Sequence, residues 1–435
     1  MINRLLPRVP DDQLPIPRDE IRIHVSATRL WAADEQILKQ EQAMKELEGQ
    51  LEGLYAEFMG RKPPAKEFAA SCSFYQADWF WFNSKTKEAE AAILEAHKLL
   101  TQAPASAPAS ASLGLLVAAK YVEILGPTDP EGAEQVAGEY LGKPGYLAPE
   151  VRAEYLKLVA EMSNTLCRQG HFEDASKMLG EQRLLLETRG GSATDLVRLD
   201  ALRGAVLARS GNAREALPIL EAVATSPLSD VLDWYNAAVV ANFTGDQDSY
   251  QRLRRICYLR FTSTAEGNAA GLVVAGLYQQ PMDEDTQAIA RALMGRADDG
   301  SRFMNFQVSS ISAVLAYREG LYPDALVQLD QFLATPSSRP GGRVILEDPA
   351  QLAGSRFMRA MICAKLERTE EAQRDFALAL DQLKLAFWDK PGHDRSGGGP
   401  WVQPWVKTYQ AESRQREAKA LFEAKGIPLP APHAK

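Results

Sequence analysis

The chain has 435 residues, of which 46% are hydrophobic and 24% charged, a composition that supports a folded core and excludes a disordered chain. Its formal net charge of -8 argues against general binding to nucleic acid or to an anionic membrane surface. No stretch is apolar enough to span a membrane, since even residues 112–125 include Lys120 and Glu123. We therefore expect a cytoplasmic protein that has no membrane segment and binds a protein or peptide partner.

The first 60 residues contain two different patterns. Residues 1–32 are rich in proline and charge, which predicts an extended N-terminal arm. Residues 33–60 are predicted to form one long helix, because apolar side chains follow a heptad at Ile37, Met44, Leu47, Leu51, Leu54 and Phe58. Two interpretations of this helix stay open. It is a coiled-coil segment that makes the chain a homo-oligomer through residues 33–59, or it packs against the helices that follow.

Residues 61–390 repeat one short pattern, in which a small residue is followed seven positions later by glycine and five positions after that by alanine. The clearest copy has Ala313, Gly320 and Ala325. Glycine favours a helix end, and small residues allow two helices to approach closely. Other copies surround Gly170, Gly211 and Gly245 and the equivalent position Glu367, and a further copy has Ala77, Ser84 and Ala89. The pattern predicts a series of helical hairpins.

We expect about eight helix pairs, at residues 66–101, 113–141, 151–188, 196–224, 231–261, 266–295, 302–334 and 352–387. The pair at 266–295 is expected from spacing alone, because it has no glycine of the pattern. Residues 101–112, an Ala/Pro/Ser stretch, are predicted to be a linker and not a helix. Residues 391–435 are predicted to contain a Gly/Trp loop, a charged capping helix and a tail.

This pattern resembles the tetratricopeptide repeat, and Trp234 occupies the aromatic position early in a first helix. The resemblance implies an all-α fold, an α-solenoid of tetratricopeptide-like helix pairs with a long N-terminal helix and a C-terminal capping helix. Over residues 150–425 the order of segments, including AYREGLYPDALVQLDQFL and QREAKALF, also resembles the repeat region of large bacterial serine/threonine protein kinases. Kinase motifs are absent from the sequence, so this resemblance implies a docking or sensor module and no kinase activity.

The sequence contains no arrangement typical of a metal, cofactor or catalytic site. Its five histidines are scattered, and Cys72, Cys167, Cys257 and Cys363 occur singly, as buried thiols do. We therefore expect no cofactor, no metal and no enzymatic activity. Residues 252–260 carry Arg252, Arg254, Arg255 and Arg260, which indicates either an anion-binding face or a solvated face with salt bridges.

If the tetratricopeptide pattern applies, the first helix of each pair faces a concave groove. The residues that the pattern assigns to the groove are Lys157, Asn164, Arg198, Tyr235, Asn242, Gln307 and Tyr317. Asn amides and Tyr rings suit a peptide or a partner helix, although each residue could also be simply solvated. The sequence thus favours a non-catalytic scaffold or adaptor that binds a protein or peptide, or a regulatory module in signalling. The alternative is a sensor that binds a small molecule or signal peptide to control an effector.

Overall fold

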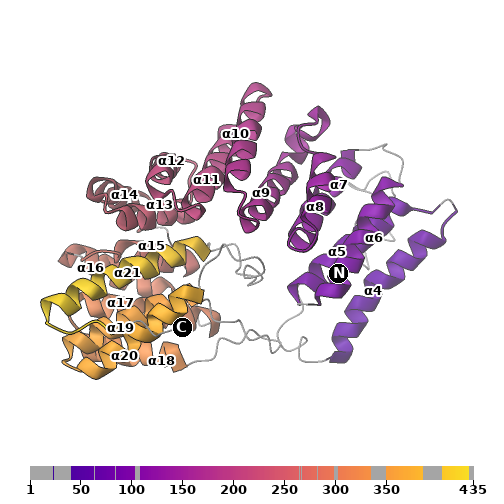
Figure 1. The fold of residues 1–435 in the computed structure, drawn as a ribbon. Coiled ribbons are helices and arrows are strands. Elements are labelled where there is room, and N and C mark those ends of the chain that lie inside the picture. The colour runs from indigo at the N-terminus through magenta and orange to yellow at the C-terminus, as the bar shows by residue number, and fades with distance from the viewer. Residues whose placement is uncertain are drawn as a thin grey trace. The chain divides into compact units, whose positions relative to one another are not determined.

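The computed structural model describes Ile23 and residues 41–62, 64–83, 85–102, 108–263, 265, 267–281, 283–297, 302–334, 349–385 and 404–430. Within these residues the chain is all-helical, with eighteen α-helices, α4 to α21, two short 3-10 turns and no strand (Figure 1). No helix in this part of the chain is long and apolar enough to cross a membrane. The contacts divide the chain into two compact units, which are described separately below.

Unit 1 comprises residues 1–166 and 184–191. Its helices are α4 (Glu41–Gly60), α5 (Lys66–Phe82), α6 (Thr86–Thr101), α7 (Pro108–Leu125), α8 (Pro130–Gly138) and most of α9 (Arg152–Arg168), with 3-10 turns η3 (Pro144–Tyr146) and η4 (Pro149–Val151) before α9. From α4 to α8 each helix packs against the next in the sequence. The linker prediction for residues 101–112 is wrong at its end, because α7 begins at Pro108. Proline is favoured at the first position of a helix, where its missing N–H costs nothing.

The apolar face of α4 is buried inside unit 1. Leu54 and Phe58 pack with Ala69 and Cys72 of α5, and Leu51 packs with Trp79. The ring of Phe58 lies 5.5 Å from that of Phe68. In this unit the described part of the heptad therefore packs against the following helix, as the second interpretation expected, whereas residues 33–40 lie outside the described residues.

Unit 2 comprises residues 167–183 and 192–435. Its helices are α10 (Phe172–Thr188, divided between the units after Arg183), α11 (Ala193–Arg209), α12 (Ala213–Thr225), α13 (Val231–Thr244), α14 (Gln247–Arg260), α15 (Gly267–Leu277), α16 (Glu284–Ala297), α17 (Arg302–Arg318), α18 (Tyr322–Ala334), α19 (Pro349–Lys365), α20 (Thr369–Leu385) and α21 (Pro404–Ala424). Consecutive helices from α11 to α20 pack as pairs, including α15 with α16, the pair without a glycine of the pattern. The expectation of an all-α chain of successively packed helices is confirmed.

The glycine position of the pattern is left-handed in every copy from Gly170 onward. The φ angles are 83° at Gly170, 86° at Gly211, 77° at Gly245 and 80° at Gly320. Glu367 occupies the same position with φ of 64° and is the one non-glycine residue with positive φ in the described part of the chain. At four copies, those of Gly211, Gly245, Gly320 and Glu367, the following N–H donates to a carbonyl five residues earlier, as Arg368 does to Cys363 at 2.9 Å. The shared backbone geometry ends each first helix in the same way.

The small residues of the pattern are buried where expected. Ala313, Ala325, Ala360 and Ala372 have no exposed surface, and neither has Ala216. Ser84 of the N-terminal copy lies outside the described residues. The spacing of small residues in the sequence thus identified the positions where helices approach closely.

Replacing Glu367 by glycine should stabilise the protein by about 0.5–1 kcal/mol. The left-handed conformation costs a non-glycine residue roughly 1–2 kcal/mol, and the extra backbone entropy of glycine offsets part of that gain. Urea unfolding measures the difference, with Gly320→Glu as the matched control that should destabilise. A lower or unchanged free energy of unfolding for Glu367→Gly would contradict this account of the turn.

Trp234 fixes the spacing between α13 and α15. Its indole Nε1 donates to the Leu253 carbonyl at 2.7 Å, and the Tyr250 hydroxyl contacts the Gly276 and Leu277 carbonyls at 2.9 and 3.0 Å. A β-carbon at Gly276 would come closer to the Trp234 ring than two carbon atoms can approach. The close contact of α13 with α15 therefore requires glycine at residue 276.

Gly276→Ala should destabilise unit 2 by about 1–3 kcal/mol because the added methyl group overpacks against a buried ring. Gly295→Ala in α16 is the matched control, since nothing lies within 4 Å of its β-carbon position. The control should stabilise by up to about 1 kcal/mol through helix propensity. Equal denaturation midpoints for the two variants would show that the α13–α15 contact is not as close as described.

Candidate partner-binding surface

The seven residues assigned to a groove lie on four helices. Lys157 is exposed and Asn164 half-buried on α9 in unit 1, and Arg198 is exposed on α11 in unit 2. The other residues are also in unit 2, with Tyr235 and Asn242 on α13 and Gln307 and Tyr317 on α17. The side chain of Gln307 lies outside the described residues.

Tyr235 does not stand free on a groove wall. Its side chain is only 3% exposed, and burial raises its pKa well above the ordinary range. A side-chain hydrogen bond with Gln410 of α21 opposes that shift, as does the charge of Arg414. Tyr235 is thus covered by the C-terminal helix, and truncating it would remove a core contact.

Tyr317 is also buried, at 8% exposure. Its hydroxyl makes a weak 3.8 Å contact with the Met361 sulfur, its ring lies 5.8 Å from the Tyr322 ring, and the Arg318 guanidinium lies over it. The assignment of Tyr235 and Tyr317 to an open groove is therefore wrong, because both side chains are part of the buried core. The spacing of the pattern placed both residues on first helices but could not show which other helices pack over them.

The helix that covers Tyr235 is α21. It packs against α19, α13 and α20, and its apolar side chains Trp405, Val406, Ala418 and Phe422 are buried (Figure 1). The ring of Tyr409 stacks on Phe243 of α13 with centroids 4.1 Å apart. The C-terminal helix was expected to close the end of the array, and the structure places it along several first helices as well.

Polar contacts fix the position of α21 on these helices. The Tyr409 hydroxyl donates to the Ala208 carbonyl of α11 at 2.5 Å, and Arg318 of α17 forms a two-point ion pair with Glu417 in which Nη2 lies 2.8 Å from Oε2. Only 7% of the Arg318 side chain is exposed. The first-helix face is the name used below for the surface that contacts α21: Ala208, Tyr235, Phe243, Tyr278 and Arg318.

Sequence reasoning missed Tyr278, Arg318, Tyr409 and Glu417, although each contributes to this contact. The signal that was present is the spacing of Trp405, Tyr409 and Phe422, which places large apolar groups on α21 where a terminal cap would be polar. A charged helix with such a stripe is expected to cover an apolar surface.

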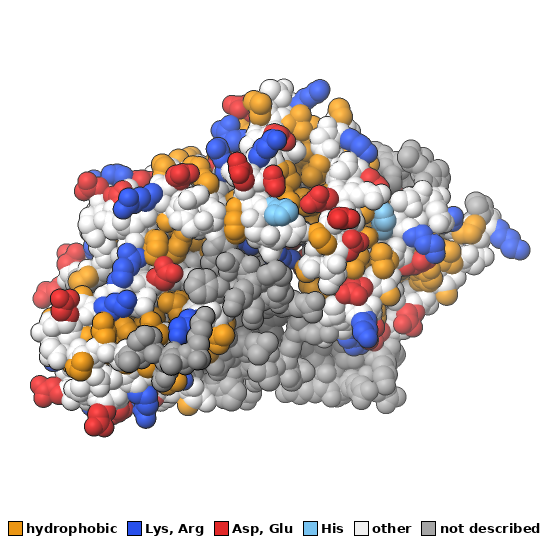
Figure 2. All heavy atoms as spheres, viewed as in Figure 1, with side chains coloured by type: hydrophobic (Ala, Val, Ile, Leu, Met, Phe, Trp, Pro, Cys, Tyr) orange, Lys and Arg blue, Asp and Glu red, His pale blue; other side chains and the backbone are white. Residues whose placement is uncertain are grey.

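The arginines of α14 are largely used within unit 2. Arg252 pairs with Glu221 at 2.7 Å, Arg254 donates to Thr286 at 2.8 Å, and Arg260 donates to the Ser226 carbonyl at 2.7 Å. Of the two interpretations, the structure supports the salt-bridged face. Over the described residues in Figure 2, acidic and basic side chains are interspersed and do not form a patch of one sign.

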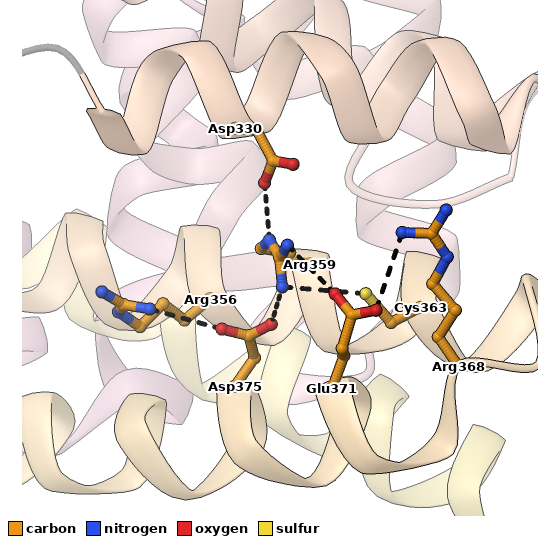
Figure 3. A network of polar contacts seen from close by, with 7 residues as sticks. All are labelled: Asp330, Arg356, Arg359, Cys363, Arg368, Glu371 and Asp375. Carbon is orange, nitrogen blue, oxygen red and sulfur yellow. Dashed lines mark hydrogen bonds and ion pairs between the residues drawn. The ribbon is translucent and has the colours of Figure 1, made fainter.

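A polar network joins α18, α19 and α20 (Figure 3). Arg359 donates to Asp330 at 2.6 Å and also contacts Asp375 and Glu371, while Arg356 lies 3.3 Å from Asp375. Arg368 pairs with Glu371. The charges of three arginines and three carboxylates cancel, so the network has no excess charge that would attract an ionic ligand. Its contacts hold these three helices together.

Removing Asp375 should destabilise the protein far more than removing Asp330. The Asp375 side chain is 3% exposed, and Asp375→Ala leaves the partly buried guanidinium groups of Arg356 and Arg359 without that partner, at a cost of about 3 kcal/mol. Asp330 is 48% exposed, so Asp330→Ala should cost less than about 1 kcal/mol. Denaturant unfolding measures the loss of unfolding free energy in each variant. A larger loss for Asp330→Ala than for Asp375→Ala would show that Asp375 is not the central carboxylate of the network.

The four cysteines are free and buried. Burial raises the pKa of Cys363 to about 11, so its thiol stays protonated at neutral pH and is a poor nucleophile. Among the described residues, no group of three or more histidine, cysteine or acidic side chains is placed to hold a metal ion.

Comparison of the chain with protein-family models finds no matching model, and comparison with curated proteins finds no match. The resemblance to the tetratricopeptide repeat and to the kinase-associated repeat region therefore stays a prediction from the sequence.

Proposed function

We propose that this chain is a non-catalytic, tetratricopeptide-like scaffold whose first-helix face binds a helix of a protein partner, as an adaptor or a regulatory module of a signalling system. The observation that carries the proposal is the position of α21. A helix distant in the sequence lies on this face, and its Tyr409 reaches Ala208 across 201 residues of chain. α21 therefore serves as an example of the ligand that the surface accepts.

The chemistry of the face suits an amphipathic helix. Phe243 offers an aromatic ring for stacking, Tyr235 and Tyr278 offer hydroxyl groups, and Arg318 offers a guanidinium that pairs with a carboxylate. Helices bind to such surfaces through apolar anchors spaced by one turn, with charged groups selecting the partner. A suitable partner helix carries aromatic anchors four residues apart, as Trp405 and Tyr409 are, and an acidic residue that reaches Arg318.

The interface with α21 combines apolar burial with several polar contacts. Gln410, Arg414 and Glu417 all make polar contacts with the array, and the buried Nε1 of Trp405 has no hydrogen-bond partner in the described part of the chain. Polar interfaces are typical of contacts that form between already folded parts. This composition supports an exchangeable contact at the first-helix face.

A charge reversal tests whether the face binds a helix supplied as a separate molecule. In the full chain, Glu417→Arg removes the carboxylate that pairs with the buried Arg318 and should weaken the seating of α21 by roughly 3 kcal/mol. A labelled peptide of residues 404–424 with the natural sequence should then bind this variant at least about tenfold more tightly than it binds the natural chain. Fluorescence anisotropy measures both affinities.

Two further variants control the experiment. Lys419→Glu reverses a charge on the exposed side of α21 and should leave peptide affinity as in the natural chain. Adding Arg318→Glu to Glu417→Arg restores an ion pair within the chain and should abolish the gain. If the Glu417→Arg chain keeps its helical circular dichroism but fails to bind the peptide, the first-helix face does not bind helices and the proposal is wrong.

A further inference from the structure

A cavity of about 440 Å³ lies beside α21 in unit 2. One wall comes from the array and includes Asn242, Tyr278, Gln280 and Arg318. The other wall comes from α21 and includes Arg414 and Arg416. Its volume lies within the range of small-molecule sites, about 300–1,000 Å³. Two segments far apart in the sequence therefore flank an open cavity that is large enough for a small ligand.

The cavity is cationic in a chain whose overall charge is negative. Its charged lining consists of three arginines, Arg318, Arg414 and Arg416, and one glutamate, Glu417, which leaves a net charge of +2. The whole chain has a net charge of -8. The local excess of positive charge contrasts with the balanced network around Arg359 and attracts an anion.

Two of the three guanidinium groups are available to a ligand. Arg318 is engaged by Glu417, but within the described part of the chain Arg414 and Arg416 have no carboxylate at ion-pairing distance. Arg414 hydrogen-bonds the Tyr278 hydroxyl, and Arg416 is held 4.5 Å above the Phe243 ring. Burial raises the pKa of the nearby Glu412 carboxyl, and the charge of Arg416 opposes this shift only in part.

Neutral polar groups complete the lining. Gln280 donates to the Asn242 side-chain oxygen at 3.2 Å, so the Asn242 amide nitrogen keeps its N–H donors. The buried hydroxyl of Ser413, which also lines the cavity, has no hydrogen-bond partner in the described residues. Guanidinium, amide and hydroxyl donors are the groups that bind phosphate oxygens in proteins.

We propose that this cavity binds a small phosphate monoester, with Arg414 and Arg416 as its charge partners and Asn242 and Ser413 as additional hydrogen-bond donors. The charge supports this class of ligand, because a phosphate monoester carries about -1.5 to -2 at pH 7 and thus matches the net +2 of the lining. A monocarboxylate would leave positive charge unmatched. Because α21 forms one wall of this cavity, the proposal applies to the chain with α21 in place, and it does not require that another helix can bind at the first-helix face.

Isothermal titration of the full chain with AMP, glucose 6-phosphate and inorganic phosphate tests the proposal at constant ionic strength. We expect saturable binding of at least one monoester, tighter than that of inorganic phosphate. Arg416→Gln should weaken this binding by about tenfold or more, since a charge-assisted hydrogen bond is lost. Arg414→Gln should weaken it similarly, but because Arg414 also contacts Tyr278, the exposed Arg416 provides the cleaner variant.

Arg255→Gln is the matched control, because Arg255 is an exposed arginine of α14 that does not line the cavity. It should bind the monoester as the natural chain does. The proposal is overturned if no monoester binds at millimolar concentration, if Arg255→Gln loses as much affinity as Arg416→Gln, or if the dicarboxylate succinate binds more tightly than the monoesters.

Discussion

The ion pair between Arg318 and Glu417, together with the stacking of Tyr409 on Phe243, holds the C-terminal helix on the first helices of unit 2. Much of the structure around it depends on this contact. It buries Tyr235, it forms one wall of the cationic cavity, and through Tyr409 and Ala208 it connects α21 to α11. An array of helix pairs has contacts mainly between neighbours, so one helix lying along several pairs couples repeats that would otherwise be independent.

The helix pairs themselves could be predicted because their determinants are local. Glycine adopts a left-handed conformation without strain, and the turn at Gly320 could therefore be placed from the sequence. The spacing of the small residues Ala360 and Ala372 placed Glu367 in the equivalent turn, where a non-glycine residue adopts the strained left-handed conformation. Small residues such as Ala325 marked the close contacts between helices because a larger side chain would not fit there.

The candidate surface could be predicted only in part. The spacing of the pattern placed Tyr235 and Asn242 on the helix face that α21 meets, but the identity of the covering segment depends on contacts between residues far apart in the sequence. The start of α7 at Pro108 and the burial of Tyr317 were missed for related reasons. Composition suggested an irregular segment at Pro108, and spacing suggested an exposed side chain at Tyr317. In both places the packing of neighbouring helices, which the local sequence does not encode, determined the structure.

The central claim is that α21 occupies a helix-binding surface as a separable element. Native-state hydrogen exchange of the full chain tests it most directly. If the claim holds, the free energy of the opening through which the α21 amides exchange is lower than that for α13 and α19 by at least about 2 kcal/mol. The amides of α13 and α19 then stay protected while those of α21 exchange. If the amides of α21, α13 and α19 exchange with the same free energy, α21 is an inseparable part of the core and the claim fails.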